Sequence, residues 1–338
     1  MKKTTMFKRL GATLTVSALL MGGLMGCSST GNESVEAPSA SASADAAYPM
    51  TYNYGGREVA FDKAPEKILT SGPTSAIYAA ELAEQGQFAY RSGEFKDPNP
   101  EADAMGAKIL SDGELSTESI ISQDVDLVIT DTFTGFDPKK VEEAGIKVIV
   151  PNSIVVHAKA DGADSLQVPD ESPFELISSD LRELGKVMGQ PKRGEEKAAE
   201  FEKKLAQFDK EKPGKGKTAA LLFYFSPEYP VMSVSNASIE GQMMERLGLE
   251  NIFADEKAPY VEEVNWETIL EKDPDVIIIK YGRTGSTFEE DKARLLTEPG
   301  ADTMKAVKND KIVGISNHNI WPTPAIIPAM QAISDSLK

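Results

Sequence analysis

Aromatic side chains and two arginines stand at the ends of apolar runs in this chain, and they are the residues best suited to bind an organic ligand. Aromatic rings stack on partly apolar molecules, and a guanidinium donates paired hydrogen bonds to anionic groups. The alternatives are surface salt bridges for the arginines and core or edge packing for the rings. The candidates for ligand contact are Arg283, Tyr281, Tyr224, Trp321, Arg91, Tyr90 and Phe133.

These candidates follow predicted strands, and parallel strands bind ligands at their shared carboxyl edge. The predicted strands are 67–71, 88–91, 127–130, 147–150, 218–225, 276–281 and 311–315. The predicted helices are 74–85, 117–122, 138–144, 239–247, 266–270, a segment near 301–307 and one from about 323. Residues 52–61 alternate around Gly55-Gly56, which indicates a β-hairpin. Strands that alternate with helices predict an α/β fold with parallel βαβ units.

One sequence pattern occurs twice. Residues 116–131 read STESIISQDVDLVITD, and residues 265–280 read NWETILEKDPDVIIIK. Each copy has a capping residue, a short helix opened by a glutamate, an aspartate-marked turn and an apolar run. The repeat predicts two similar Rossmann-like lobes with a ligand cleft between them.

A long helical segment, 173–211, separates the two copies. Gly189-Gln190-Pro191 is expected to end one helix and begin the next, because proline suits a first helical turn and glycine a helix end. Four apolar residues then fall on one face of the following helix: Ala198, Phe201, Leu205 and Phe208. We expect a first lobe at 48–172, a bridging helical segment at 173–211 and a second lobe at 212–338.

Composition and motifs exclude several classes of function. The formal net charge is −17, which disfavours nucleic-acid binding because the chain repels phosphate backbones. The sequence contains no Gly-x-Ser-x-Gly elbow, dinucleotide glycine signature or zinc-hydrolase His-Glu pair. We therefore expect a binding protein and not an enzyme. A lipid-anchored enzyme and a surface scaffold with a vestigial cleft remain as alternatives.

The N-terminus has the pattern of an export signal. The first 26 residues contain four basic side chains, no acidic one and an apolar stretch that ends at Gly26. Leu24-Met25-Gly26-Cys27 resembles the lipobox of bacterial lipoproteins, which implies a signal peptide at 1–26 and lipidation of Cys27. The alternative is an uncleaved anchor. Residues 27–47 have little to bury and are expected to be a flexible tether.

Taken together, these segments resemble the substrate-binding lipoproteins of ABC importers that serve ferric siderophores, haem and vitamin B12, the class III periplasmic binding proteins. The hairpin at 56–59, the segment LGKVMG at 184–189, the paired Glu/Asp segments and the ending at 306–313 carry the resemblance. It implies two α/β lobes joined by one stiff helix and a location on the outer face of the cytoplasmic membrane. We expect a monomer held there by its lipid anchor.

The resemblance also implies a role for two acidic residues. In this family one glutamate on each lobe docks against arginines of the permease, and the matching residues are Glu118 and Glu267. A symmetric permease would favour two equivalent charge contacts. The alternative is that each glutamate only complements the positive end of its helix. Asp126 and Asp275 are interpreted as turn residues at the entrance to a strand.

The expected ligand is a metal chelate, with a ferric siderophore favoured and vitamin B12 or haem as alternatives. No resident cofactor and no protein-bound metal are expected, because sites for bare zinc or manganese need several converging His and carboxylate ligands. The chain has only His157 and His318. His318 lies in a predicted cleft loop, where axial coordination of haem or cobalt is an alternative role. His157 is interpreted as polar surface.

Overall fold

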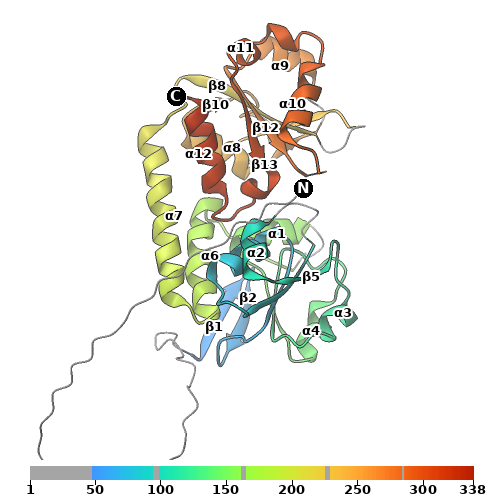
Figure 1. The fold of residues 1–338 in the computed structure, drawn as a ribbon. Coiled ribbons are helices and arrows are strands. Elements are labelled where there is room, and N and C mark those ends of the chain that lie inside the picture. The colour runs from blue at the N-terminus through green and yellow to red at the C-terminus, as the bar shows by residue number, and fades with distance from the viewer. Residues whose placement is uncertain (1–47, 94–98, 161–164, 225–228, 263, 284) are drawn as a thin grey trace, which may run out of the picture. The chain divides into compact units, whose positions relative to one another are not determined.

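The computed structural model describes residues 48–93, 99–160, 165–224, 229–262, 264–283 and 285–338 (Figure 1). The predicted signal peptide, Cys27 and the predicted tether lie outside these ranges. No helix among the described residues is long and apolar enough to cross a membrane.

The described part of the chain opens with the predicted hairpin. Strands β1 (Met50–Tyr54) and β2 (Arg57–Phe61) pair antiparallel, and Tyr54 faces Arg57 across the turn. Gly55 and Gly56 form that turn with φ of 54° and 80°, a region that glycine enters without a steric penalty. The glycine pair therefore sets the register of the hairpin.

The first lobe contains a parallel sheet with strands in the order β5-β4-β3-β6-β7. Its strands are β3 (Ile68–Ser71), β4 (Phe88–Ser92), β5 (Lys108–Ser111), β6 (Leu127–Thr130) and β7 (Lys147–Ile149). Its helices are α1 (Pro73–Leu82), α2 (Pro100–Met105), α3 (Thr117–Ile121), α4 (Pro138–Glu143) and α5 (Val155–Ala160). The central strands β3 and β6 are buried at every residue, as expected for a parallel sheet covered on both faces. The elements α2, β5 and α5 were not predicted.

The second lobe contains a mixed sheet in the order β11-β9-β8-β12-β13, and β10 also pairs with β8. Its strands are β8 (Lys217–Tyr224), β9 (Val231–Val234), β10 (Leu249–Asn251), β11 (Tyr260–Val261), β12 (Val276–Tyr281) and β13 (Ile312–Ser316). Its helices are α8 (Ile239–Arg246), α9 (Trp266–Lys272), α10 (Phe288–Leu296), α11 (Lys305–Lys308) and α12 (Ile326–Ser336). The three predicted strands, β8, β12 and β13, run parallel as expected, whereas β9 and β11, which the sequence did not predict, run antiparallel to their partners.

The chain passes from the first lobe to the second through α6 (Pro173–Val187) and α7 (Pro191–Glu211) (Figure 1). Near its start α7 is tied to α1 and the residue that follows it, through Lys197 with Glu81 at 2.5 Å and Arg193 with the carbonyl of Ala83 at 3.0 Å. Near its end Asp209 pairs with Arg246 of α8 at 2.6 Å. The apolar face of α7 belongs to one hydrophobic core that includes residues of both lobes.

Close packing of α6 on α7 depends on two glycines. A Cβ on Gly194 would lie 2.5 Å from the carbonyl oxygen of Leu181, and one on Gly185 would lie 2.8 Å from the Cα of Gly194. Because backbone atoms cannot yield as a side-chain end can, these positions require glycine. The segment LGKVMG therefore contributes to the packing that fixes the connecting helix.

The duplicated segments occupy equivalent places in the two sheets. Asp126, just before β6, accepts the backbone N–H of Lys67 at 2.9 Å, at the entrance to the neighbouring strand β3. Asp275, just before β12, accepts the N–H of Thr218 at 3.0 Å, at the start of the neighbouring strand β8. Each aspartate thus anchors the first residues of two parallel strands, so the repeat in sequence is a repeat in structure.

Candidate functional site

Each lobe has a point where the order of its strands reverses. In the first sheet the chain moves outward from β3 to β4 and β5, then returns to the other side of β3 with β6 and β7. In the second sheet the reversal lies between β8 and β12. Open α/β sheets bind ligands in the crevice at the carboxyl ends of the strands on either side of such a point. The two crevices are therefore the places to look for a site.

Both crevices open into one cavity of about 870 Å³. From the first lobe it is lined by residues at the ends of β3 and β6, including Ser71, Gly72 and Asp131. From the second lobe it is lined by Phe223 of β8 and Lys280 of β12. This volume lies within the range of roughly 300–1,000 Å³ that is typical of sites for small organic molecules.

Asp131 joins β6 to the N-terminus of α1. Its carboxylate accepts the backbone N–H groups of Thr74 and Ser75, both at 2.8 Å, and the Ser75 hydroxyl at 2.5 Å. Gly72, the N-cap residue, has no side chain to cap the helix, so a carboxylate from the neighbouring strand takes that role. Burial raises the pKa of Asp131 to about 6, although these hydrogen bonds act to lower it.

Gly72 has room for no side chain. Its φ is 116°, and a Cβ there would lie 2.4 Å from the Cγ of Asp131. The glycine therefore lets the carboxylate approach the end of α1, and the backbone of that turn forms part of the cavity wall.

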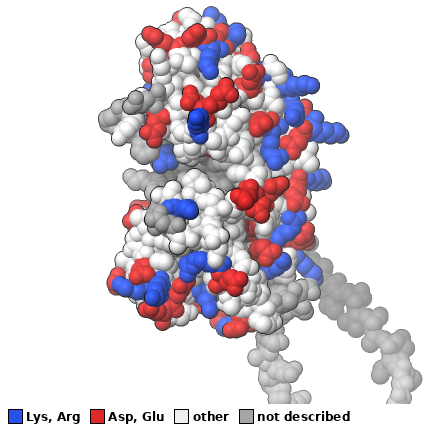
Figure 2. Space-filling view, turned by 180° about the vertical axis from the view of Figure 1, so that it is seen from behind, with Lys and Arg blue, Asp and Glu red and all other residues white. Residues whose placement is uncertain are grey.

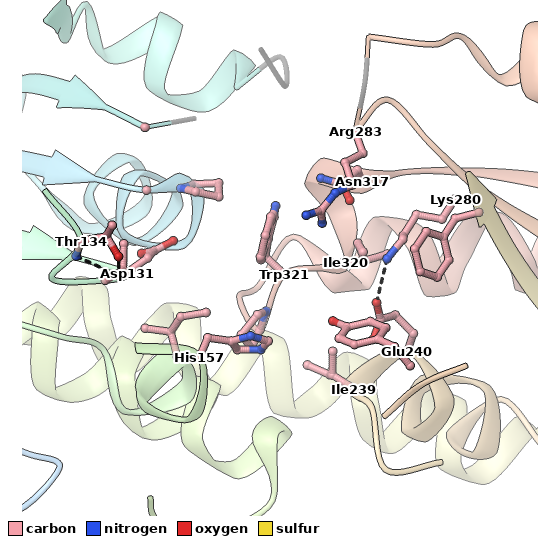
Figure 3. A pocket seen from close by; sticks show the side chains of 18 of the residues that line it. Asp131, Thr134, His157, Ile239, Glu240, Lys280, Arg283, Asn317, Ile320 and Trp321 are labelled. Atoms are coloured by element: carbon pink, nitrogen blue, oxygen red, sulfur yellow. Dashed lines mark hydrogen bonds and ion pairs between the residues drawn. The ribbon is translucent and has the colours of Figure 1, made fainter. Parts of the chain in front are cut away.

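A buried ion pair forms the opposite wall. The Nζ of Lys280 lies 3.2 Å from Oε1 of Glu240 on α8, and the two side chains are only 3% and 2% exposed (Figure 3). The ammonium also lies 3.9 Å from the centre of the Phe223 ring and 5.6 Å from that of Tyr260. The negative charge of Glu240, together with burial, raises the pKa of Tyr260. The phenol therefore stays protonated beside this carboxylate.

Two of the predicted ligand residues line the cavity. Arg283, just after β12, is exposed, and Trp321 is half-buried and follows the 3-10 helix η3 (Asn317–Ile320). Figure 3 shows the Trp321 ring between Asp131 of the first lobe and Lys280 of the second. The ring nitrogen of Trp321 is buried without a hydrogen-bond partner among the described residues, so a donor is available beside the cavity.

Arg91, Tyr90 and Phe133 lie outside the lining of the cavity. Arg91 is 5% exposed and forms an ion pair with Asp103. Tyr90 and Phe133 pack against the apolar core of the first lobe, and the ring of Phe133 lies 6.0 Å from that of Phe136. That these three residues contact the ligand stays a prediction. In the structure their side chains interact within the first lobe and do not line the cavity.

Tyr224 and Tyr281 are also absent from the cavity lining and pack in the core of the second lobe. The guanidinium of Arg294 lies 3.8 Å from the centre of the Tyr224 ring, and burial raises the pKa of this tyrosine. Tyr281 packs against Phe288 of α10, with 6.0 Å between ring centres. The structure therefore brings together Arg283 and Trp321 but not the other five candidates.

The structure places both histidines differently from the sequence expectation. His157 lies on α5 and lines the cavity, so its interpretation as polar surface is wrong. The cause is that α5 was not predicted, and this helix carries the side chain to the cavity. His318 is 5% exposed, and its Nε2 lies 3.1 Å from Glu101 of the first lobe. It is absent from the lining, and an axial role for it stays a prediction.

The described residues contain no group of three or more His, Cys, Asp or Glu side chains placed to hold a metal ion.

Glu118 and Glu267 have matching local geometry on the two lobes. Each is exposed at the second residue of a short helix, after the capping residues Ser116 and Asn265. Within the described ranges neither carboxylate takes part in an ion pair or a side-chain hydrogen bond. On the face shown in Figure 2, acidic and basic side chains are interspersed. Cys27, the predicted lipidation site, lies outside the described residues.

Sequence reasoning found Arg283 but missed the other charged residues of the cavity. Asp131 and Lys280 are the last residues of the two copies of the repeat, so the alignment contained a signal for both. Glu240 carried no such signal, because an acidic residue in the first turn of a helix is typical of exposed helix starts. Its burial depends on α8 packing against β8, next to β12, which only the fold reveals.

Comparison with known proteins agrees with this architecture. A vitamin B12-binding protein of Pectobacterium carotovorum is 25% identical over 219 residues, which cover 64% of this chain and 71% of that protein. A solved ABC-type Fe3+-hydroxamate transport protein of Saccharomonospora viridis superposes with a TM-score of 0.65 at 24% identity, over 86% of this chain and 99% of the other. A periplasmic haem-binding protein of Pseudomonas aeruginosa gives 0.61 at 16% identity, over 81% and 92%. The fold of these structures is shared.

The pattern of the family described as periplasmic binding protein matches residues 68–318. That span runs from β3 to His318 of η3, so it includes the main sheet of each lobe, the connecting helix and nearly all of the cavity lining. The two-lobed α/β fold and the resemblance to the importer-binding proteins are confirmed. The chain belongs to the periplasmic binding protein family.

Proposed function

We propose that this protein is the extracytoplasmic solute-binding component of an ABC importer, which captures a ferric siderophore and delivers it to the permease. The observation that carries the proposal is the cavity at the two strand-order reversals, lined by Trp321 and by the aromatic rings of Phe223 and Tyr260. Rings of this kind stack on the partly apolar surface of a large chelate. Arg283 supplies a donor for its polar groups.

Vitamin B12 is the second candidate ligand, because several curated relatives are named vitamin B12-binding proteins. Haem is a third, because haem-binding proteins share the fold. The protein would act at the outer face of the cytoplasmic membrane, with Cys27 as its lipid anchor. Two acyl chains bind a membrane stably where one gives only marginal binding.

The function can be tested by tryptophan fluorescence, since the chain has two tryptophans in different surroundings. Trp321 lines the cavity, whereas Trp266 lies on α9 and its ring nitrogen donates to the carbonyl of Pro299 at 2.8 Å. We expect a ferric siderophore to quench the emission saturably. Trp321→Phe should remove the quenching, and Trp266→Phe, the matched control, should retain it. A flat titration with ferric siderophores, cyanocobalamin and haemin would refute the proposed function.

A further inference from the structure

The charge of the cavity bears on which chelates can enter it. Among its described lining residues, carboxylates outnumber permanent cations two to one. The carboxylates are Glu114, Asp131, Glu240 and Glu262, and the cations are Lys280 and Arg283. The formal net charge of the whole chain, −17, has the same sign. A field of this sign disfavours the approach of polyanions and favours that of cations.

The lysine does not offset this balance for a ligand. Its ammonium is paired with Glu240 at 3.2 Å and lies against the rings of Phe223 and Tyr260. The pair is almost wholly buried, so its two charges largely cancel for any ligand group that does not touch the pair directly. An anionic chelate would therefore meet Arg283 together with the exposed acids Glu114 and Glu262.

Glu240 also has an unused acceptor. Its Oε1 receives the hydrogen bond from Lys280, but its Oε2 is buried and has no partner among the described residues. The residue is 1% exposed and lines the cavity (Figure 3). A buried carboxylate oxygen without a donor is costly, and a donor that reaches it forms a strong, charge-assisted hydrogen bond. A ligand with an N–H or ammonium group would supply that donor.

We propose that the cavity selects chelates that are uncharged or positively charged overall, and that Glu240 accepts a hydrogen bond from a donor on the ligand. The inference rests on the proposed function and narrows its ligand class. It favours hydroxamate chelates, whose three ligand charges neutralise ferric iron. It disfavours tris-catecholates, which remain multiply anionic, and haem, which has two carboxylates.

Three iron chelates separate charge from size. Ferrioxamine B has an uncharged trihydroxamate core and one pendant ammonium. Its N-acetyl derivative keeps the core without the charge, and ferric enterobactin is a multiply anionic catecholate. By calorimetry in low salt we expect ferrioxamine B to bind at least about threefold more tightly than its N-acetyl derivative, and ferric enterobactin about tenfold or more weakly than either. Salt should reduce these differences.

Glu240→Gln tests the acceptor, because it keeps the shape of the side chain and removes the charge. Ferrioxamine B should bind this variant about fivefold or more weakly, and its advantage over the N-acetyl derivative should disappear. Glu245→Gln, on the exposed face of the same helix, is the matched control and should change neither affinity. If Glu240→Gln fails to fold, Glu262→Gln, an exposed lining residue, should still reduce the advantage of ferrioxamine B.

The outcomes distinguish a failure of the charge inference from a failure of the proposed function. Tightest binding of ferric enterobactin or haemin would overturn the charge inference and leave the importer function standing. Binding of cyanocobalamin alone would support the charge inference, since that corrinoid is uncharged overall, and would correct the siderophore assignment. Binding of none of these compounds would overturn the proposed function and this inference with it. An unchanged preference in Glu240→Gln would remove Glu240 from the site.

Discussion

Asp131 and Lys280 occupy the same position in the two copies of the repeated segment, and both line the cavity from opposite lobes. The two residues have opposite charge and different partners. Asp131 caps α1 through backbone N–H groups, and Lys280 pairs with Glu240. The repeat therefore conserves a place in the fold, at the carboxyl end of a central strand, and not a chemical role. A duplicated scaffold can in this way present an asymmetric site.

The first prediction concerns docking to the permease. The double variant Glu118→Arg/Glu267→Arg should reduce uptake of the chelate in cells strongly and leave its affinity for the purified protein unchanged. The reason is that both glutamates are exposed, lie on separate lobes and are absent from the cavity lining. Like charges that face each other across an interface weaken binding by roughly several kcal/mol, which is enough to prevent docking.

A matched control is available on the connecting helix. Glu196 and Glu200 are exposed on α7, and the variant Glu196→Arg/Glu200→Arg changes the net charge by the same amount. Uptake should remain near the wild-type rate in this control. Equal loss of uptake in both double variants would show a general effect of charge and remove the docking assignment.

The second prediction separates the two arginines named from the sequence. Arg283 lines the cavity and is exposed, so Arg283→Gln should weaken binding of N-acetylferrioxamine B by about threefold or more through loss of a donor. Its free energy of unfolding should stay within about 0.5 kcal/mol of the wild-type value. Isothermal calorimetry and urea denaturation measure the two effects.

Arg91→Gln should behave in the opposite way. Arg91 is buried and paired with Asp103, so its loss should lower the free energy of unfolding by about 1–3 kcal/mol. Ligand affinity should change little, because the side chain is absent from the lining. An affinity loss as large as that of Arg283→Gln would place Arg91 in the binding site after all.

The third prediction concerns the turn at Gly72. Gly72→Ala introduces a Cβ 2.4 Å from the Cγ of Asp131 at a φ of 116°. Gly86→Ala is the matched control, since Gly86 also has a positive φ, 88°, and a Cβ there meets nothing within 4 Å. Overpacking typically costs 1–3 kcal/mol, so Gly72→Ala should unfold with about that much less free energy than Gly86→Ala. Equal urea midpoints would mean that Asp131 moves aside without cost.

The sequence accurately predicts the strands that consist of a continuous apolar run between two turn signals. Strands β6 and β12 have the bounds expected from the sequence, because each follows an aspartate-marked turn and is buried on both faces. Strand β5 was missed, since it is a partly exposed edge strand without a long apolar run. Helix α10 was also missed, although Thr287 and Glu290 form a capping box that marks its start.

The site was predictable only in part, for a physical reason. The carboxyl ends of parallel strands can be located from the order of elements, and this predicted Arg283 and Trp321 at the edge of the second sheet, where both line the cavity. The burial of a charged pair depends on which helix covers which strand. Lys280 and Glu240 are far apart in sequence and meet only because α8 packs against β8, next to β12. No local pattern reports such a contact.

The fourth prediction concerns pH. Asp180 on α6 accepts the backbone N–H of Asn152 at 2.9 Å and that of Ser153 at 2.8 Å, and burial raises its pKa to about 6. The folded-state pKa then lies above the value of about 3.9 in an unfolded chain, so protonation favours the folded state. This contribution is complete at low pH and is lost as the pH rises through 6. Asp131 has a pKa shift of the same direction and size.

Each carboxyl should therefore add about 1 kcal/mol to the free energy of unfolding when the pH falls from 7 to 5. Urea denaturation gives the change in the free energy of unfolding between these two pH values for the wild type and for Asp180→Asn. The difference between the two changes is the contribution of Asp180. The variant should be less stable at both pH values, and its gain on acidification should be smaller by about 1 kcal/mol. If Asp180→Asn does not fold, Asp131→Asn serves the same comparison. An identical gain in wild type and variant would show that the carboxyl remains ionised in the folded protein throughout this range.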